Sequence, residues 1–247
     1  MSVQLAHRTG TEAEVWEALE TVRDPELDES IVALSFVAGV QIDEGSVHVQ
    51  LRLPTYFCAP NFAYLMVSDA FDAVTTAAGG RFVQIRLDDH FASEEINGGV
   101  SAGAGFQGSF PGQAREELDE LRVAFQRKAH AACLERASAQ LIKNGWLMED
   151  LGTATLADLP DTPQSASLLR RRAELGLPTE PERPMFVDAQ GKAVAQDDLG
   201  LHLRLARATR VSIEGNSGMC RGLLATRYGD GTHPGTRSGV AAGRGQS

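Results

Sequence analysis

The sequence predicts an α+β fold, in which a small mixed sheet with packed helices is followed by a mostly helical C-terminal extension. Two kinds of pattern in the first 90 residues lead to this prediction. Apolar and polar residues alternate in 47–53 and 81–87, as they do in half-buried strands. Apolar residues recur at helical spacing in 11–22 and 60–77. The expected core therefore has the order α-β-β-α-β, a compact unit with helices packed on a small sheet.

Both helices of this core have recognisable ends. Thr11 and Glu14 fit a capping box at the start of the first helix. Pro25 stops that helix, because the residue before a proline avoids the helical region. Pro60 suits the first position of the second helix, and the glycine pair at 79–80 ends it.

The strands are expected on either side of the second helix. A β-hairpin is indicated by three consecutive segments: the run 36–42, the turn DEGS and the run 47–53. A third strand follows the second helix at 81–87, where apolar residues alternate with Gln84 and Arg86. These three strands are the expected sheet.

The rest of the chain is less regular. Residues 98–112 contain six glycines but no G-x-x-x-x-G-K-[ST] pattern, so we expect a mobile loop rather than a phosphate-binding loop. A long helix is expected from 113 to about 143, and shorter ones at 197–208 and 217–227. The expected segments are the core at 1–90, the loop at 91–112, the mostly helical extension at 113–228 and a disordered tail at 229–247.

Composition narrows the class of protein. The formal net charge of −10 argues against nucleic acid or an acidic membrane surface as a partner, because both bind basic patches. No stretch reaches the roughly 18 apolar residues of a membrane-spanning helix, and the first 30 residues lack the apolar region of a secretory signal. Three cysteines, an odd number, do not suggest a disulfide framework. We expect a cytoplasmic protein with reduced thiols.

Cys58 is the first candidate functional residue. It lies between the second strand and Pro60, so its thiol is expected at or next to a helix N-terminus. There the helix dipole and the unpaired amides favour the thiolate, the form that attacks electrophiles and binds soft metals. Taken alone, the position also fits a small buried apolar residue, which is what a free cysteine usually is.

Three motifs in a fixed order carry a resemblance to a known family. They are Asp24-Pro25-Glu26, the stretch SIVALSFV at 30–37, and a segment running from Thr55 through Cys58 to Pro60. Together with the hairpin between them, they resemble the iron–sulfur cluster assembly family that includes the PaaD and SufT proteins. The resemblance covers about residues 12–90. The chain departs from the family pattern at Ser35, where glycine is usual, and at Ala59, which separates the usual Cys-Pro pair.

The resemblance implies a function for this domain. It implies that Cys58 is the functional thiol, supported by Asp24, Glu26 and Thr55, and that the protein helps insert iron or an iron–sulfur cluster, held transiently, into a client apo-enzyme. In its extended form the chain looks like the longer proteins that accompany bacterial multicomponent di-iron monooxygenases. A component of such an oxygenase is therefore the expected client, and a homodimer is a further option.

Other residues are candidate metal ligands. Asp89 and His90 end the third strand, and a mixture of histidine and carboxylate suits iron, although a capped turn explains them equally well. Cys220 is expected in the first turn of a helix, a setting like that of Cys58, so the two thiols are candidates for one shared metal site. The alternative is an ordinary buried cysteine. Asp24 is either a helix stop that bonds the local backbone or a carboxylate close to the Cys58 thiol.

Two further residues receive a structural interpretation. Cys133 falls inside the long helix and is expected to be buried, without a role in chemistry. His48 alternates with apolar residues and is expected on the solvent face of the hairpin.

Three functions of different kinds remain open. The first is a maturation factor, not an enzyme, that carries iron or an iron–sulfur cluster on Cys58. The second is a cysteine enzyme for thiol redox or acyl transfer, which is weakened by the lack of a C-x-x-C motif or a histidine in a recognisable partner motif. The third is a metal-free adaptor that binds an oxygenase subunit through its acidic surface. We expect the first.

Overall fold

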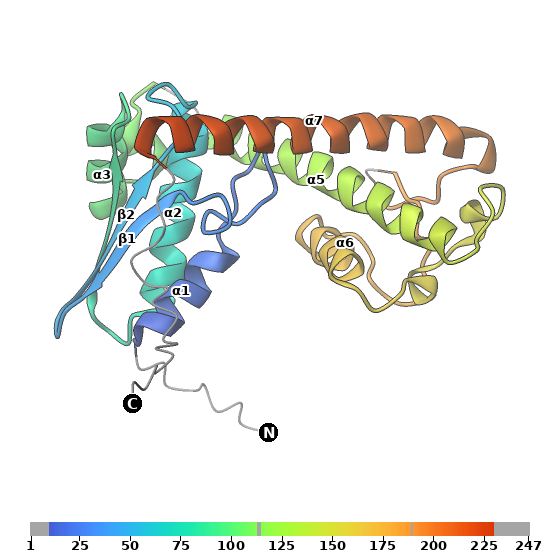
Figure 1. Cartoon of the computed structure of the whole chain (residues 1–247), viewed down its shortest axis with the longest axis horizontal. Coiled ribbons are helices and arrows are strands. Elements are labelled where there is room, and N and C mark those ends of the chain that lie inside the picture. The colour runs from blue at the N-terminus through green and yellow to red at the C-terminus, as the bar shows by residue number, and fades with distance from the viewer. Residues whose placement is uncertain (1–9, 113–114, 189, 230–247) are drawn as a thin grey trace, which may run out of the picture.

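The computed structural model describes residues 10–112, 115–188 and 190–229 and shows an α+β unit joined to a helical extension (Figure 1). Its helices are α1 Glu12–Thr21, α2 Pro60–Ala77, α3 Ser93–Ser101, α4 Gly105–Ser109, α5 Arg115–Lys143, α6 Pro163–Glu174 and α7 Gln196–Tyr228, with short 3-10 turns at Leu151–Thr153 and Leu156–Asp158. Its strands are β1 Val37–Ile42, β2 Ser46–Arg52 and β3 Phe82–Asp88. The expected fold class and the α-β-β-α-β order are confirmed. Among the described residues, no helix combines the length and the apolar character needed to span a membrane.

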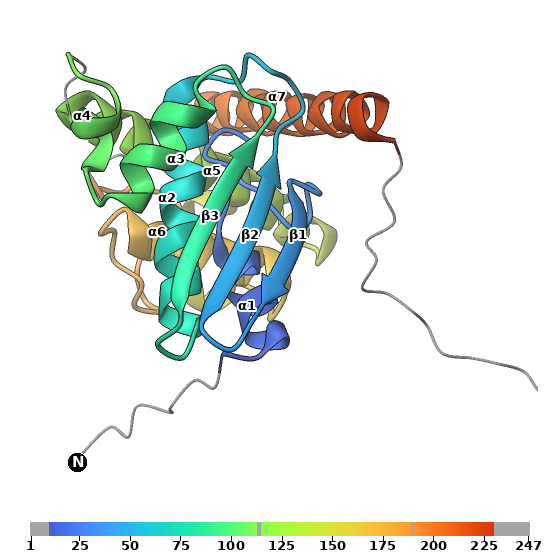
Figure 2. The same cartoon turned by 90° about the vertical axis from the view of Figure 1, so that its left-hand side faces the viewer.

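The sheet is mixed, as expected. Its order is β1-β2-β3, with β1 antiparallel and β3 parallel to β2. The parallel pair is possible because α2 carries the chain back to the start of β3. One face of the sheet packs on α1 and α2, and the other faces outward (Figure 2). His48 lies on the outward face and hydrogen-bonds Gln84 at 3.0 Å.

Alternation along the strands produces the first hydrophobic core. Val47, Val49 and Leu51 of β2 are buried, and Val83, Ile85 and Leu87 of β3 align with them. Apolar residues of α1 and α2 complete the layer. Leu118 of α5 and Leu224 of α7 belong to the same cluster, so both ends of the extension are anchored in the core of the α+β unit.

A second core holds the extension together. It joins one face of α5 to α6, to the start of α7 and to the segment around Met185 and Phe186. Cys133 is part of this cluster and only 2% exposed, as expected for a structural cysteine. Burial raises the pKa of its thiol, which keeps it neutral.

The glycine-rich segment differs from the expectation of a mobile loop. Residues 93–109 form α3 and α4, which pack through the buried residues Ile96, Val100 and Phe106. The Phe106 ring lies 5.1 Å from the ring of Tyr64 on α2. These three apolar residues are widely spaced, which is why the surrounding glycines hid them in the sequence. Gly99 allows the two helices to approach, since a Cβ there would meet the Ser109 Oγ at 1.7 Å.

The C-terminal helices expected at 197–208 and 217–227 are one continuous helix, α7. Gly215, Asn216 and Gly218 suggested a break, because these residue types disfavour helix interiors. In the structure Ser217 is buried between them and its hydroxyl donates to Glu29. Packing against the α+β unit therefore outweighs the local preference. The expected tail at 229–247 lies outside the described residues apart from Gly229.

The departure from the family pattern at Ser35 has a structural cost. Ser35 has a φ of 62°, in the left-handed region that glycine adopts without strain. The turn it occupies leads into β1, with its amide bonded to the Val32 carbonyl. A position where the family usually has glycine therefore still requires a glycine-like backbone.

We predict that Ser35→Gly raises the free energy of unfolding by up to about 1 kcal/mol, because it removes the left-handed strain of a residue with a Cβ. Urea unfolding followed by circular dichroism measures this. Ala33→Gly, an exposed change in the same turn, is the control and should be neutral or destabilising. A Ser35→Gly variant that is less stable than wild type contradicts this reading of the turn.

A second prediction concerns the two adjacent glycines of α3. Gly99→Ala should destabilise the protein by about 1–3 kcal/mol, because the added methyl group overlaps Ser109. Gly98→Ala meets nothing within 4 Å and should be neutral or stabilising by up to about 1 kcal/mol, since alanine favours a helix. Equal stability of the two variants would show that α3 and α4 do not pack as described.

Candidate functional site

The candidate site is the loop that connects β2 to α2, residues 53–59, here called the cysteine loop. Cys58 is half-buried there and immediately precedes Ala59, the N-cap of α2, while Pro60 is the first helical residue. The expected position of the thiol beside a helix N-terminus is thus confirmed. The Thr55 hydroxyl lies 3.3 Å from the Cys58 sulfur, so the two side chains share a hydrogen bond.

His90 fixes the backbone of the cysteine loop. Its Nδ1 accepts a hydrogen bond from the Ala92 amide at 3.2 Å, so Nε2 carries the proton and donates to the Cys58 carbonyl oxygen at 2.7 Å. Burial lowers the pKa of His90, which favours this neutral form. Both ring nitrogens are occupied. In this arrangement His90 holds the loop in place and has no nitrogen free for the metal that the sequence led us to expect.

Asp24 shapes the turn that precedes the site. Residues 24–29, here called the acidic turn, follow α1, and the Asp24 Oδ1 accepts hydrogen bonds from the amides of Glu26 and Leu27, both at 2.8 Å. Asp24 is 8% exposed, and burial raises its pKa to about 6, although the two amide bonds act in the opposite direction. This geometry matches the first interpretation of Asp24, a side chain that bonds the local backbone.

The extension holds the acidic turn from two sides. On one side Asp28 forms a buried ion pair with Arg171 of α6. On the other, Glu29 pairs with Arg221 of α7 and accepts a hydrogen bond from Ser217. Burial alone would raise the pKa of Glu29, but the bonds from Arg221 and Ser217 lower it below its ordinary value. Asp24, which the resemblance implied as a support for Cys58, therefore lies in a turn whose other carboxylates bind the extension.

Glu26, another residue expected to support the thiol, also faces α7. Its Oε1 accepts a hydrogen bond from the Asn216 side-chain amide at 3.3 Å. The acidic turn thus contacts α7 through Glu26 and Glu29, in the stretch just before Cys220.

Cys220 reaches the site by a different route from the one expected. It lies in the last third of α7, not in the first turn of a helix, so no helix N-terminus favours its thiolate. Burial, together with the charges of Asp24, Cys58 and Glu26, raises the pKa of Cys220 to about 11. Cys220 and Cys58 also pack against the same hydrophobic cluster. Both cysteines therefore lie at the same hydrophobic cluster. The raised pKa keeps the Cys220 thiol neutral at pH 7.

The end of α7 is fastened to the loop after β3. Arg227 donates to the carbonyl oxygens of Leu53 at 3.3 Å and Asp89 at 2.8 Å, and the Tyr228 hydroxyl bonds the Asp89 carboxylate at 3.2 Å. The Arg52 guanidinium lies over the Tyr228 ring, 4.7 Å from its centroid. Asp89 is thus engaged with α7.

The expected metal ligands are therefore divided. Cys58 and Cys220 pack against the same hydrophobic cluster and interact electrostatically, Asp89 faces the end of α7, and His90 bonds the backbone. In the part of the chain that the structure describes, no three His, Cys, Asp or Glu side chains form a group able to hold a metal.

Sequence reasoning missed the aromatic rings around Cys58. Tyr56, Phe57 and Phe91 are 46%, 78% and 46% exposed, with ring centroids 5.0–6.2 Å apart. The Phe91 amide donates to the Tyr56 carbonyl, which ties the two loops together. The pair Tyr56-Phe57 directly before Cys58 was a visible signal, but its exposure was not. The contacts of Ser217 and Arg221 with the acidic turn gave no local signal at all.

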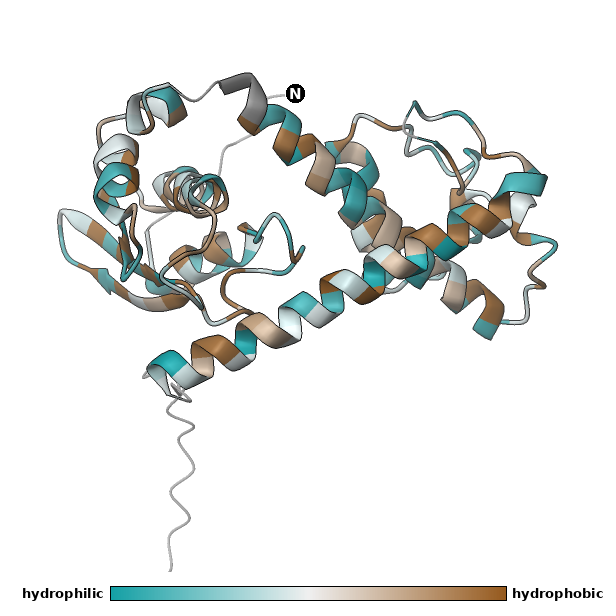
Figure 3. Ribbon diagram, turned by 90° about the horizontal axis from the view of Figure 1, so that it is seen from above, coloured by the Kyte–Doolittle hydropathy of each residue, from teal (hydrophilic) through white to brown (hydrophobic). Residues whose placement is uncertain are grey.

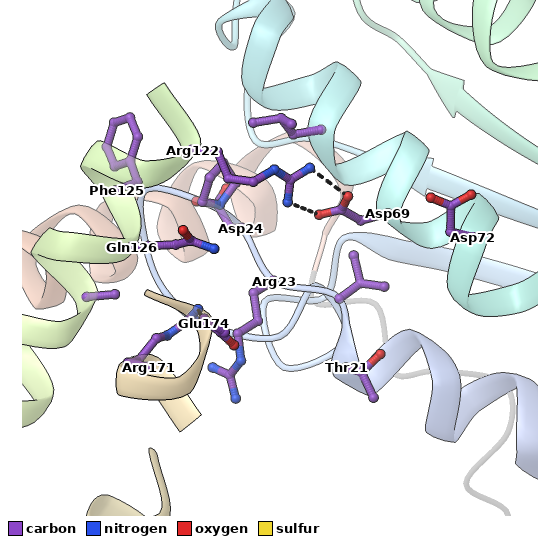
Figure 4. A pocket seen from close by; sticks show the side chains of 14 residues that line it. Thr21, Arg23, Asp24, Asp69, Asp72, Arg122, Phe125, Gln126, Arg171 and Glu174 are labelled. Carbon is purple, nitrogen blue, oxygen red and sulfur yellow. Dashed lines mark hydrogen bonds and ion pairs between the residues drawn. The ribbon is translucent and has the colours of Figure 1, made fainter. Parts of the chain in front are cut away.

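A separate cavity of about 320 Å³ lies on the other side of the acidic turn (Figure 4). It opens between α2, α5 and α6 and is lined by Asp24 but not by Cys58. Arg122 forms a two-pronged ion pair with Asp69 inside it, at 2.8 Å for each bond. Its three arginines face four carboxylates, so it has no surplus positive charge that would select an anion.

Fold and site together define a class: an α-β-β-α-β unit with one half-exposed thiol in the loop that opens its second helix. Residues 12–87 match the family model described as iron–sulfur cluster assembly protein. An uncharacterized protein of Methanocaldococcus jannaschii is 32% identical over 88 residues, which cover 35% of this chain and 90% of that protein. No solved structure matches the chain.

The chain therefore belongs to the iron–sulfur cluster assembly protein family, through the unit that runs from α1 to β3. Membership supports a role in cluster assembly. The matched region ends at residue 87, so His90, Phe91 and the whole extension, including Cys220, lie outside it.

Asp24 generates a prediction about pH. Its pKa is about 6 in the folded protein against an ordinary 3.8, so the folded state binds the proton more tightly. The stability contributed by Asp24 is fully present below about pH 4 and is lost as the pH rises through about 6. Asp24→Asn keeps the oxygen that accepts the two amide bonds. It should therefore gain on wild type as the pH rises from about 4 to 7, by at most about 3 kcal/mol.

Unfolding curves of both proteins at several pH values measure this difference. Asp43→Asn, in the exposed turn of the hairpin, controls for the loss of one negative charge. If the stability difference between Asp24→Asn and wild type did not change with pH, the carboxyl would not be buried as described.

Proposed function

We propose that this protein is a maturation factor that holds iron or an iron–sulfur cluster on the Cys58 thiol and passes it to a client apo-enzyme. One observation carries the proposal. Within a domain of the iron–sulfur cluster assembly family, Cys58 is partly open to solvent on a loop fixed by His90, and a second cysteine, Cys220, packs against the same hydrophobic cluster. Thiolates are the ligands that iron–sulfur centres use most.

The residues present fit a transient cargo better than a permanent one. Cys58 and Cys220 are the two cysteines that pack against this part of the core, whereas an iron–sulfur cluster is usually held by four cysteine ligands. An incomplete ligand set leaves positions that the receiving enzyme can fill, which is what transfer requires. Binding of the metal would also displace the proton of Cys220, since a coordinating thiol is deprotonated.

The surroundings of Cys58 favour a carrier over a cysteine enzyme. A nucleophilic thiol needs a base within hydrogen-bond reach, and the side chain that bonds the Cys58 sulfur is Thr55, a hydroxyl. The nearby imidazole of His90 donates to the backbone and lacks a free nitrogen to accept a proton. We propose that the protein is not an enzyme.

The enzyme that receives the cargo, the client, is the second element of this function. We propose an oxygenase, a component of a di-iron monooxygenase, because the extended chain looks like the proteins that accompany those enzymes. The exposed rings of Tyr56, Phe57 and Phe91 lie on the cysteine loop and on the loop bonded to it, so we expect an enzyme that takes cargo from Cys58 to contact them.

Anaerobic reconstitution with ferrous iron and sulfide tests the proposal. Wild type should take up iron, with visible absorbance from sulfur-to-iron charge transfer, and Cys58→Ser should lose most of that iron. We expect Cys220→Ser to take up less iron than wild type. Cys133→Ser, a change in the second core, is the control and should keep the iron.

The serine variants should remain folded, since a thiol-to-hydroxyl change costs only about 1–3 kcal/mol even without a hydrogen-bond partner. Circular dichroism confirms this before iron is measured. Iron and sulfide contents of Cys58→Ser equal to those of wild type would overturn the role of the thiol.

A further inference from the structure

An open groove runs between α5 and α7, in the half of the molecule away from the sheet (Figure 1), and Figure 3 shows this part of the molecule from above. The groove encloses about 610 Å³. Its floor is mostly apolar and is formed by Ala139, Ile142, Met148, Gly200 and Leu203. The groove lies outside the region that the family model matches and does not include either thiol of the proposed site.

The walls of the groove have the spacing of a helix-packing surface. The α5 wall uses positions 135, 138, 139 and 142, and the α7 wall uses 200, 203, 204 and 207. Both follow the pattern i, i+3, i+4, i+7, the stripe that a helix normally buries against another helix. On its other side α5 is already covered by α6 and the segment around Met185. The groove is thus the place where one more helix fits on the α5–α7 pair.

The apolar floor is exposed to solvent. Ile142 is 41% and Met148 57% exposed, although both point into a concave surface. Apolar side chains gathered in a groove gain free energy when a partner covers them.

Charge at the rim selects the kind of partner. Arg204 and Arg207 line the α7 edge, and neither forms an ion pair or hydrogen bond with a residue that the structure describes. Arg210, at the end of the groove, is neutralised by Glu135 and Glu214. Two unpaired cations at an apolar groove are conspicuous in a chain with a net charge of −10. Carboxylates of a partner would complement them.

The opposite end of the groove has the reverse preference. Met148 is followed by the exposed acids Glu149 and Asp150, which would repel a second row of carboxylates. The complementary helix therefore carries its acids along one edge only.

We propose that this groove binds an acidic amphipathic helix of a partner protein. Apolar residues of that helix, spaced i, i+3, i+4 and i+7, cover the floor, and carboxylates along one edge pair with Arg204 and Arg207. The α7 wall from 200 to 210 is about 15 Å long, which matches a bound helix of about three turns. Binding here leaves the cysteine loop free.

Fluorescence anisotropy with a labelled synthetic peptide tests the proposal. The probe is an amphipathic helical peptide with leucines at the stated spacing and glutamates along one edge. The full-length protein should bind it, with weaker binding at higher salt, because the pairs form at an exposed rim. The same peptide with lysine in place of glutamate should bind at least tenfold more weakly.

Variants locate the binding site. The double change Arg204→Glu with Arg207→Glu should weaken binding at least tenfold, and Ile142→Ser should also weaken it. The charge-matched control, Arg127→Glu with Lys128→Glu, alters exposed cations of α5 outside the groove and should bind as wild type does. Met219→Ser, an exposed residue elsewhere on α7, is the control for Ile142→Ser.

Two results would overturn the proposal. One is equal affinity for the acidic and basic peptides, and the other is unchanged affinity in the Arg204, Arg207 double variant. Cys58→Ser should bind the peptide normally, so failure of the groove and failure of the thiol site are separate outcomes. Circular dichroism of each variant excludes unfolding as the cause of lost binding.

Discussion

The arrangement of the site depends on the ion pairs and hydrogen bonds between the extension and the acidic turn. Asp28 is paired with Arg171 of α6, and Glu29 is paired with Arg221 of α7. The same turn is fixed internally by the amide bonds of Asp24. The Asp28–Arg171 pair is buried, and a buried charge that loses its partner is strongly destabilising, so this pair favours one placement of the extension over others.

That placement determines what surrounds the thiol. Ser217 and Arg221 bind Glu29, so the turn of α7 between them, which carries Cys220, faces the α+β unit. Farther along, Arg227 and Tyr228 reach the loop after β3, which itself supports the cysteine loop through His90. The added helix thus brings a second cysteine, Cys220, to the hydrophobic cluster against which Cys58 packs. The added element contributes to the site through packing rather than through a sequence motif.

The parts of the fold that depend on local periodicity could be predicted from the sequence. The alternation in 47–53 and 81–87 identified β2 and β3, and the stripe after Pro60 identified α2. Each of these patterns shows, within a single strand or helix, which side chains face the core. The helices α3 and α4 were missed because three widely spaced apolar residues bury them among glycines. The continuity of α7 was missed because contacts with Glu26 and Glu29, about 190 residues away, outweigh its Gly and Asn content.

The candidate site divides in the same way. Asp24, Thr55 and Cys58 all belong to the three motifs seen in the sequence. The order of those motifs was enough to place Asp24 in a turn and the other two residues in the loop before α2. The role of His90 depends on where its ring points after β3, and sequence alone left both a metal ligand and a capped turn open. Cys220 was named for a helix start that does not exist, and yet it lies near Cys58, because α7 folds back over the acidic turn.

A trivalent organic arsenical tests whether the Cys58 and Cys220 sulfurs lie close enough to bind one atom. Phenylarsine oxide forms a stable adduct only when two thiols reach the same arsenic atom. In a Cys133→Ala background only the Cys58 and Cys220 thiols remain. If they lie close together, we expect one arsenic per folded chain by mass spectrometry. Replacing either remaining cysteine with serine should abolish the adduct. The folded Cys133→Ala protein could instead bind no arsenic while both thiols react singly with a small alkylating reagent. That result would show that the two sulfurs do not lie close together.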